Sequence, residues 1–332
     1  NLNYKRWAPI GRGFRSFKGS LDGAGYKIYN FSITGKQDTD IHYKQGLFSA
    51  IEGDYIKNLT LSNVHIADAA NASTAYDVGA LAGYIFNNTR VENCHVQNVI
   101  IQVGVYSAGG LAGGIVSDAN KTELVKDGGL FGCTAQNITI EPHAVMQAVG
   151  NYGGLVGHIS AIKTGDGYTL EHCDATGIIS TEIAKSSIDG GDWGGIGGLV
   201  GAMIGGSYDG NTGTATKNND YLVRDCHAAV TVTAPKLGGI GGLFGESSFL
   251  TMENCSASGD VTGRWEVGGL SGTGTASALR GCHATGNVTA SNWHVGGLVG
   301  YGVKATLDRC FATGDVTTTH RNTFDSRAGG LL

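Results

Sequence analysis

Residues 267–290 read VGGLSGTGTASALRGCHATGNVTA, and the three phrases within this stretch return along the whole chain. The first phrase is Gly-Gly-Leu, the second is an apolar residue three positions before a cysteine, and the third is Ala-x-Gly-x-Val. In this copy the glycine pair begins at Gly268 and the cysteine is Cys282. Self-similarity at a fixed period is typical of repeat architectures. The chain is therefore predicted to be an array of stacked repeats.

The cysteine slot of the repeat holds all seven cysteines of the chain, and in two earlier copies it holds a bulky apolar residue. We expect these nine side chains to point inward as a core ladder, because buried free cysteine behaves as a small hydrophobe. Neighbours about 4.8 Å apart with parallel Cβ vectors suit disulfide geometry poorly, and an odd number of thiols leaves one unpaired. Disulfides are the weaker alternative, and metal binding is weaker still because no CxxC spacing occurs. The predicted ladder is Phe31, Leu59, Cys94, Cys133, Cys173, Cys226, Cys255, Cys282 and Cys310.

Short segments of alternating apolar and small residues, with glycine at the bends, make up each repeat. This alternation is typical of half-buried strands. The fourth residue after the cysteine slot is glycine or asparagine in eight of nine copies, with Val230 as the exception, which predicts a tight corner with positive φ. Stacked copies predict an all-β fold, a right-handed parallel β-helix of about nine coils with three short strands per coil. The rival, a leucine-rich repeat, needs a shorter unit that is not visible here.

The repeat extends over the whole chain, so residues 1–332 are predicted to form a single β-helix domain. Both ends fall inside a repeat, and we expect the chain to be a fragment of a longer extracellular protein. A net charge of −5 and a charged fraction of 15% argue against nucleic acid as a partner. No apolar run reaches the roughly 18 residues of a membrane span.

Insertions interrupt the repeat in the middle of the chain, where the base unit of 27 to 29 residues lengthens. After the Gly-Gly-Leu leucine, three consecutive copies carry extra residues, at 116–128, 158–168 and 202–221. The corner before Gly-Gly-Leu is also enlarged, at residues 67–77, 141–152, 181–195 and 317–327. Consecutive insertions should stack on one edge of a solenoid. Insertions confined to particular corners are typical of a binding face.

Polar and aromatic residues in and beside these insertions are the predicted binding residues. Two tryptophans precede Gly-Gly-Leu by the same offset in adjacent copies and should stack. Exposed stacked rings are suited to grip sugars, whereas rings packed over a corner are the simpler interpretation. The predicted binding patch is Asp166, Tyr168, Asp189, Asp192, Trp193, Tyr208, Asp209, Tyr221, Trp265 and Trp293.

Motifs that carry catalysis are missing from the sequence. It contains no His-Glu-x-x-His zinc motif, no Gly-x-Ser-x-Gly elbow and no phosphate-binding loop. Polysaccharide lyases and hydrolases also use β-helices, and they need paired carboxylates or an acidic calcium site. Asp189, Asp192 and Asp209 are conceivable acids but lack a partner motif. We expect no catalytic residue, no metal and no cofactor, and hence no enzyme.

The Gly-Gly-Leu-x-Gly motif followed by apolar-x-x-Cys-x-Ala-x-Gly-x-Val resembles the GLUG repeat family. The opening of the chain is similar too, with WAPIG at residues 7–11, LDG at 21–23 and IYNF at 28–31. The resemblance covers nearly the whole chain. It implies a secreted or cell-surface β-helix of the kind found in bacterial adhesin-like proteins and in the non-catalytic parts of immunoglobulin-A peptidases. The family motif is structural, so the resemblance assigns no catalytic residue.

We expect a non-catalytic, extracellular adhesin-like or scaffold module that presents the stacked mid-chain loops to a glycan or a host surface protein. One alternative is a carbohydrate-active enzyme, a polysaccharide lyase or hydrolase on the same fold. Another is a structural spacer or filament unit that self-associates through its coil ends, or the non-catalytic part of an immunoglobulin-A-type peptidase. A binder predicts a functional loop patch, an enzyme predicts converging carboxylates, and a spacer predicts loops packed flat.

Overall fold

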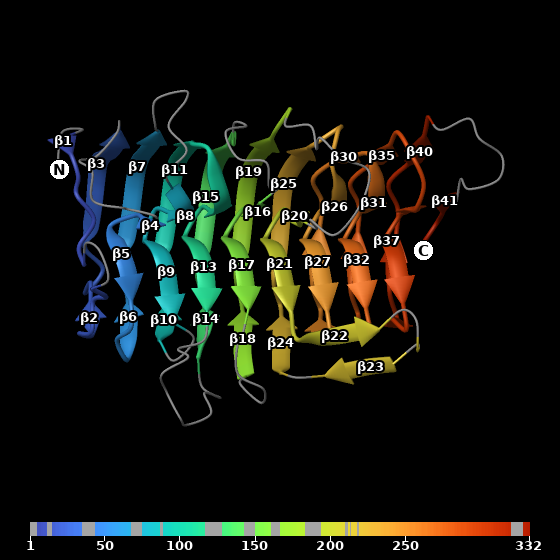
Figure 1. Cartoon of the computed structure of the whole chain (residues 1–332), viewed down its shortest axis with the longest axis horizontal. Coiled ribbons are helices and arrows are strands. Elements are labelled where there is room, and N and C mark those ends of the chain that lie inside the picture. The colour runs from blue at the N-terminus through green and yellow to red at the C-terminus, as the bar shows by residue number, and fades with distance from the viewer. Residues whose placement is uncertain are drawn as a thin grey trace.

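A computed structural model describes residues 5–11, 15–34, 44–67, 75–86, 89–116, 128–142, 150–160, 167–182, 194–209, 212, 214–217, 219–319 and 328–332. Within these residues the protein is all β, and 41 short strands stack into an elongated rod with the two chain ends at opposite ends (Figure 1). The described segments offer no helix long and apolar enough to cross a membrane. The predicted class, a parallel β-helix of about nine coils, is confirmed.

Four parallel sheets run along the rod, not the three that we predicted. Sheet C precedes the cysteine slot and sheet A follows it. Sheet C consists of β2 (Leu21–Asp22), β6 (Tyr55–Lys57), β10 (Arg90–Glu92), β14 (Gly129–Phe131), β18 (Gly167–Glu171), β24 (Asp220–Arg224), β28 (Leu250–Glu253), β33 (Ala278–Arg280) and β38 (Thr306–Asp308). Sheet A consists of β1 (Lys5–Arg6), β3 (Lys27–Thr34), β7 (Thr60–Ala67), β11 (His95–Gln102), β15 (Thr134–Ile140), β19 (Asp174–Ser180), β25 (His227–Thr233), β29 (Ser256–Ala257), β30 (Val261–Gly263), β34 (His283–Ala284), β35 (Val288–Ala290), β39 (Phe311–Ala312) and β40 (Val316–Thr318).

The strand before each Gly-Gly-Leu bend belongs to sheet D, and the strand after it belongs to sheet B. Sheet D consists of β4 (Lys44–Gln45), β8 (Ala75–Gly79), β12 (Val105–Gly109), β16 (Asn151–Gly153), β20 (Ile196–Gly197), β26 (Gly238–Gly241), β31 (Trp265–Gly268), β36 (Val295–Gly296) and β41 (Ala328–Gly329). Sheet B consists of β5 (Phe48–Ile51), β9 (Ala82–Phe86), β13 (Ala112–Val116), β17 (Val156–Ser160), β21 (Val200–Ile204), β27 (Phe244–Ser248), β32 (Ser271–Thr275) and β37 (Val299–Val303). A fifth, antiparallel sheet joins β22 (Gly206–Asp209) and β23 (Thr214–Lys217).

The last glycine of the Gly-Gly-Leu-x-Gly motif lies where sheets D and B pack against each other. A Cβ atom on the last glycine of Gly-Gly-Leu-x-Gly would overlap backbone atoms of sheet D in the preceding coil. Gly113 faces Val78 in this way, and Gly245 faces Ile196. Sheets D and B therefore approach each other too closely at these positions for a Cβ atom, and we call the boundary between the two sheets the D–B seam. A glycine at this position is required by close backbone approach.

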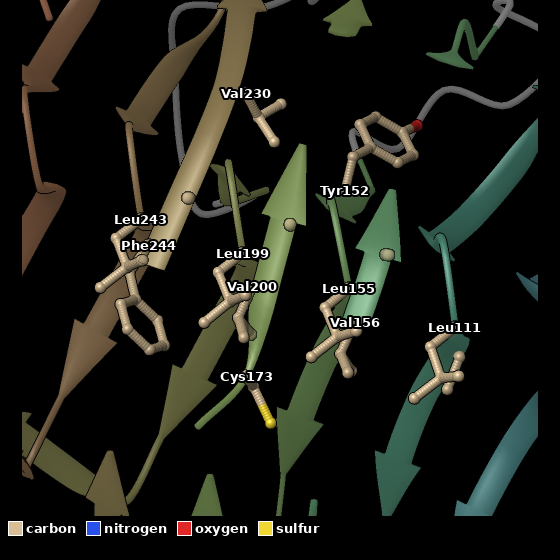
Figure 2. Close-up of a cluster of buried hydrophobic side chains, with 14 of the residues drawn as sticks. Leu111, Tyr152, Leu155, Val156, Cys173, Leu199, Val200, Val230, Leu243 and Phe244 are labelled. Atoms are coloured by element: carbon tan, nitrogen blue, oxygen red, sulfur yellow. The ribbon is translucent and has the colours of Figure 1, made fainter. Parts of the chain in front are cut away.

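The interior of the rod is filled by the same repeat positions in every coil. Figure 2 shows the Gly-Gly-Leu leucines of successive coils side by side, and all four labelled copies are fully buried: Leu111, Leu155, Leu199 and Leu243. All seven cysteines are free, and all except Cys310 are buried. The backbone N–H of the residue after the slot donates to the slot carbonyl of the preceding coil, as in Thr134 N to Cys94 O at 3.1 Å. Slot residues of neighbouring coils therefore lie one above the other.

The predicted corner after the cysteine slot is right for asparagine and wrong for some glycines. Asn63, Asn98 and Asn137 have φ between 53° and 56°, and the Asn98 side-chain amide donates to Asn63 Oδ1 at 2.9 Å. Gly259 and Gly286 do not adopt this left-handed conformation. They are glycine because a Cβ atom would overlap the carbonyl group of the neighbouring coil. The exception, Val230, is an ordinary buried strand residue that pairs with Gly177.

Candidate functional site

Long connections from sheet B to sheet C occur in three consecutive coils. They are residues 117–128 between β13 and β14, 161–166 between β17 and β18, and 205–219 between β21 and β24. The next coil joins β27 to β28 through residue 249 alone. The flanking strands keep their register across these insertions, for example Ile115 with Ile159 and Ile159 with Met203. The stacked coils therefore keep their register on both sides of the insertions.

The third insertion contains a hairpin made by β22 and β23. Its antiparallel pairs include Ser207 with Thr216 and Asp209 with Thr214. Figure 1 shows the hairpin leaving the lower edge of the rod and running along it toward the C-terminal coils. The base of the hairpin is closed by two backbone bonds, Gly205 N to Ser248 O at 2.7 Å and Asn219 N to Gly205 O at 2.8 Å. The hairpin is thus fixed to the rod at its root and follows the lower edge of the rod (Figure 1).

The surface of this hairpin is rich in hydroxyl groups. Its exposed residues are Ser207, Asp209, Thr212, Thr214, Thr216 and Lys217. At its tip the Thr212 hydroxyl donates to Asp209 Oδ2 at 2.8 Å, which orients the Asp209 carboxylate. Hydroxyl, carboxylate and ammonium groups supply hydrogen-bond donors and acceptors for a polar ligand.

Two predicted binding residues lie in the core instead of on the loops. Tyr168 is 1% exposed and Tyr221 is 4% exposed, and they pair in register in β18 and β24. Both strands begin earlier than the sequence pattern suggested. Each tyrosine therefore stands two residues before an inward-facing residue, Leu170 or Val223, and side chains two apart on a strand share a face. The prediction that Tyr168 and Tyr221 lie on the binding loops is therefore wrong.

Of the other predicted residues on the insertions, some lie on the hairpin and the rest lie outside the described residues. Asp209 is exposed at the hairpin tip, and Tyr208 precedes it in β22, where it pairs with Ala215. Four further predicted residues lie outside the described residues: Asp166, Asp189, Asp192 and Trp193. The hairpin is therefore the described part of the predicted binding edge.

The two repeat-position tryptophans differ in their surroundings. The Trp265 indole lies against Gly238, where a Cβ atom would overlap it, and the Arg264 guanidinium lies 4.7 Å from the centre of the ring. Trp265 therefore packs over a corner of the rod. Trp293 is 36% exposed one coil further on. A ring with this exposure offers an apolar contact surface to a ligand.

A buried polar cluster that no sequence motif predicted lies on the D–B seam. Asp77 of β8 and Ser107 of β12 are both 0% exposed, and His158 of β17 reaches them from sheet B. The His158 Nδ1 atom lies 3.0 Å from Ser107 Oγ and 3.8 Å from Asp77 Oδ1. Gly114 makes room for this arrangement, since a Cβ atom there would overlap the imidazole. Burial raises the pKa of Asp77 to about 7 and lowers the pKa of His158 to about 4.

These are the residue types of a serine-hydrolase triad, but the geometry differs. In a triad the serine and the carboxylate approach different nitrogens of the imidazole. Here Ser107 Oγ and Asp77 Oδ1 both approach Nδ1 of His158. The Ser107 hydroxyl is also fully buried and donates to the Gly113 carbonyl at 2.8 Å. The cluster therefore presents no nucleophile to a substrate.

The sequence does carry a signal for the cluster, in its offset from the repeat. Asp77 and Ser107 each stand two residues before the first glycine of their Gly-Gly-Leu or Gly-Ala-Leu segment. Glu266 has the same offset, is 5% exposed, and has a pKa raised to about 7, first by burial and then by the Glu246 carboxylate. Among the described residues, no group of three His, Cys, Asp or Glu side chains has a geometry that holds a metal ion.

Comparisons with known proteins support the family and the fold. The family model of the GLUG motif matches residues 291–317, which include Gly296 and Cys310. No curated protein matches the chain in sequence. The chain is similar to a crystal structure from Bacteroides ovatus described as a "putative immunoglobulin A1 protease", with 20% identity and a TM-score of 0.52. The match covers 77% of this chain and 66% of that one, just under two thirds of its length, and at this identity it shows a shared fold alone.

Proposed function

We propose, for a chain that carries the GLUG motif on a parallel β-helix, that it is a non-catalytic extracellular module that holds a binding edge on a rigid rod. The observation that carries this proposal is the insertion of residues 205–219 as a hairpin at one edge. The flanking strands β21 and β24 remain paired in register with β17 and β18 of the preceding coil. An insertion that leaves the coils unchanged adds surface and not stability. Long loops on a regular scaffold are where binding residues concentrate.

The rod is suited to hold this edge still. Each inner strand is bonded on both sides, as β11 is to β7 and β15 through six or more paired residues on each side. The interior carries buried apolar side chains at every coil. In a solenoid of this kind each coil is held by contacts with its two neighbours, so the coils do not move independently. The hairpin therefore keeps a defined place relative to the rest of the rod.

The chemistry of the hairpin supports a polar ligand, either a glycan or a host surface protein. Its exposed side chains are hydroxyls with one carboxylate and one ammonium group, at Asp209 and Lys217. The name of the Bacteroides ovatus relative refers to immunoglobulin A1, so this antibody is the first host protein to test for binding. The same relative supports a closely allied second candidate, the non-catalytic part of a peptidase directed at that antibody.

A binding screen with matched threonine variants tests the proposal. The wild-type chain is applied to a glycan array and to immobilised immunoglobulin A. The double variant T214A/T216A removes two exposed hairpin hydroxyls, and T262A/T289A removes two hydroxyls from strands β30 and β35 of sheet A as a control. We expect the hairpin variant to lose at least about tenfold in affinity, the equivalent of about 1.4 kcal/mol. Equal binding by both variants would contradict a hairpin site.

A further inference from the structure

The Asp77 carboxyl group is in an unusual environment for an acid. It is completely buried, and its hydrogen-bond contact with the Tyr84 hydroxyl falls short of normal geometry. The atom nearest to it that could carry a compensating charge is His158 Nδ1, 3.8 Å from Asp77 Oδ1. A buried carboxylate with such weak partners is costly, and the usual response is that the group stays protonated.

Several other side chains face Asp77 from the elements packed around it. Lys44 of β4 places its ammonium group 4.1 Å from the centre of the Tyr84 ring, and Tyr84 of β9 lies beside Asp77. Ser107 of β12 pairs with Asp77 in register, and His158 comes from β17. Tyr106 of β12 acts on Tyr84. Lys44 and Tyr84 both act to lower the pKa of Asp77, but burial outweighs them.

We propose that Asp77 is a proton-binding site that clamps the D–B seam, so that the N-terminal half of the rod is held tightly in mild acid and loosens above neutral pH. The position of the group carries the inference. Asp77 touches sheet B through His158 and Tyr84, and it lies where the Gly113 backbone approaches sheet D most closely. A charge created at this point must be accommodated by separating the two sheets or by admitting water between them.

The direction of the effect follows from linkage. The pKa of Asp77 is about 7 in the folded protein, above its ordinary value of 3.8. Between pH 3.8 and pH 7 the Asp77 carboxyl is therefore protonated in the folded protein and ionised in the unfolded chain. The contribution of Asp77 to stability is complete below about pH 4 and is lost as the pH rises through about 7. His158 acts in the opposite sense. Its pKa of about 4 lies below 6.5, so its contribution is present above pH 6.5 and is lost as the pH falls through about 4.

Substitution of Asp77 by asparagine separates its effect from that of His158, because the amide has the same shape and does not titrate. Urea unfolding of wild type and D77N is measured from pH 5 to pH 8.5, with the exposed acid variant D54N as a control. Between pH 5 and 7 we expect the unfolding constant of wild type to rise relative to D77N by about tenfold per pH unit, and to level off above that range. D54N should follow wild type.

A direct titration keeps the proposal testable if D77N does not fold. The carboxyl groups of the wild-type protein, labelled with ¹³C at aspartate, are followed by NMR over the same pH range. A carboxyl resonance that titrates near pH 7 and is assigned to Asp77 would support the proposal. Parallel pH profiles of wild type and D77N, or an Asp77 carboxyl that titrates near pH 4, would overturn it.

Discussion

The indole of Trp265 lies directly on Gly238, the residue with which it pairs in the preceding coil. A Cβ atom at Gly238 would overlap the indole, so Gly238→Ala must displace the ring from its corner. Overpacking of this kind costs about 1 to 3 kcal/mol, and we expect a loss of that size in urea unfolding. Gly330→Ala is the control, since a Cβ atom there meets nothing within 4 Å. Equal stability of the two variants would show that the ring does not depend on Gly238.

The side-chain amide ladder at the corner after the cysteine slot predicts a ranking of variants at Asn98. Asn98 has a φ of 54°, donates to Asn63 Oδ1 and accepts from Asn137 Nδ2 at 2.8 Å. Asn98→Ala loses both bonds and places an alanine in the left-handed region, with an expected cost of about 2 to 4 kcal/mol. Asn98→Gly loses the bonds but tolerates the backbone conformation, so it should be the milder change. A glycine variant less stable than the alanine variant would contradict this account.

The cysteines should differ in reactivity according to their burial. Cys94 is buried, and burial raises its thiol pKa, so little of the reactive thiolate is present near neutral pH. Cys310 is partly exposed. In the native protein we expect a thiol reagent to modify Cys310 first, and in urea to modify all seven thiols. Cys310→Ser should abolish the fast phase, and fewer than seven reactive thiols after unfolding without reductant would reveal a disulfide.

Much of the fold follows from the repeat alone. The apolar-x-x-Cys segment pairs with itself from coil to coil, as Val91 does with Ile56 and Leu130, and this is what a fixed repeat position predicts. The number of strands per coil was predicted wrongly because the three motifs predicted three strands, whereas Gly-Gly-Leu lies between two strands, one in sheet D and one in sheet B. The last glycine of the motif has a different reason, since Gly113 and Gly245 lie where the two sheets approach each other. Periodicity does not distinguish these two uses of glycine.

The candidate site was less predictable than the fold. Asp209 was predicted on an insertion and is exposed on one, whereas Tyr168 and Tyr221 lie in strands that extend into the predicted loops. Asp77 and His158 belong to different coils and to different sheets, and only the stacking of coils brings them together. A motif search along the chain cannot find such a pair. Comparison of the same offset in successive repeats would have found Asp77, Ser107 and Glu266.

The most direct test of the proposed function is to remove the hairpin and measure binding. In the variant, residues 205–219 are replaced by a two-residue turn like that at residues 276–277, between β32 and β33. The wild-type chain and the variant are compared on the glycan array and on immobilised immunoglobulin A, and their melting temperatures are measured alongside. We predict that the wild-type chain binds a ligand and that the variant loses this binding while it melts at the same temperature. Undiminished binding by the folded variant, or no binding by the wild-type chain, would contradict a hairpin-borne binding edge.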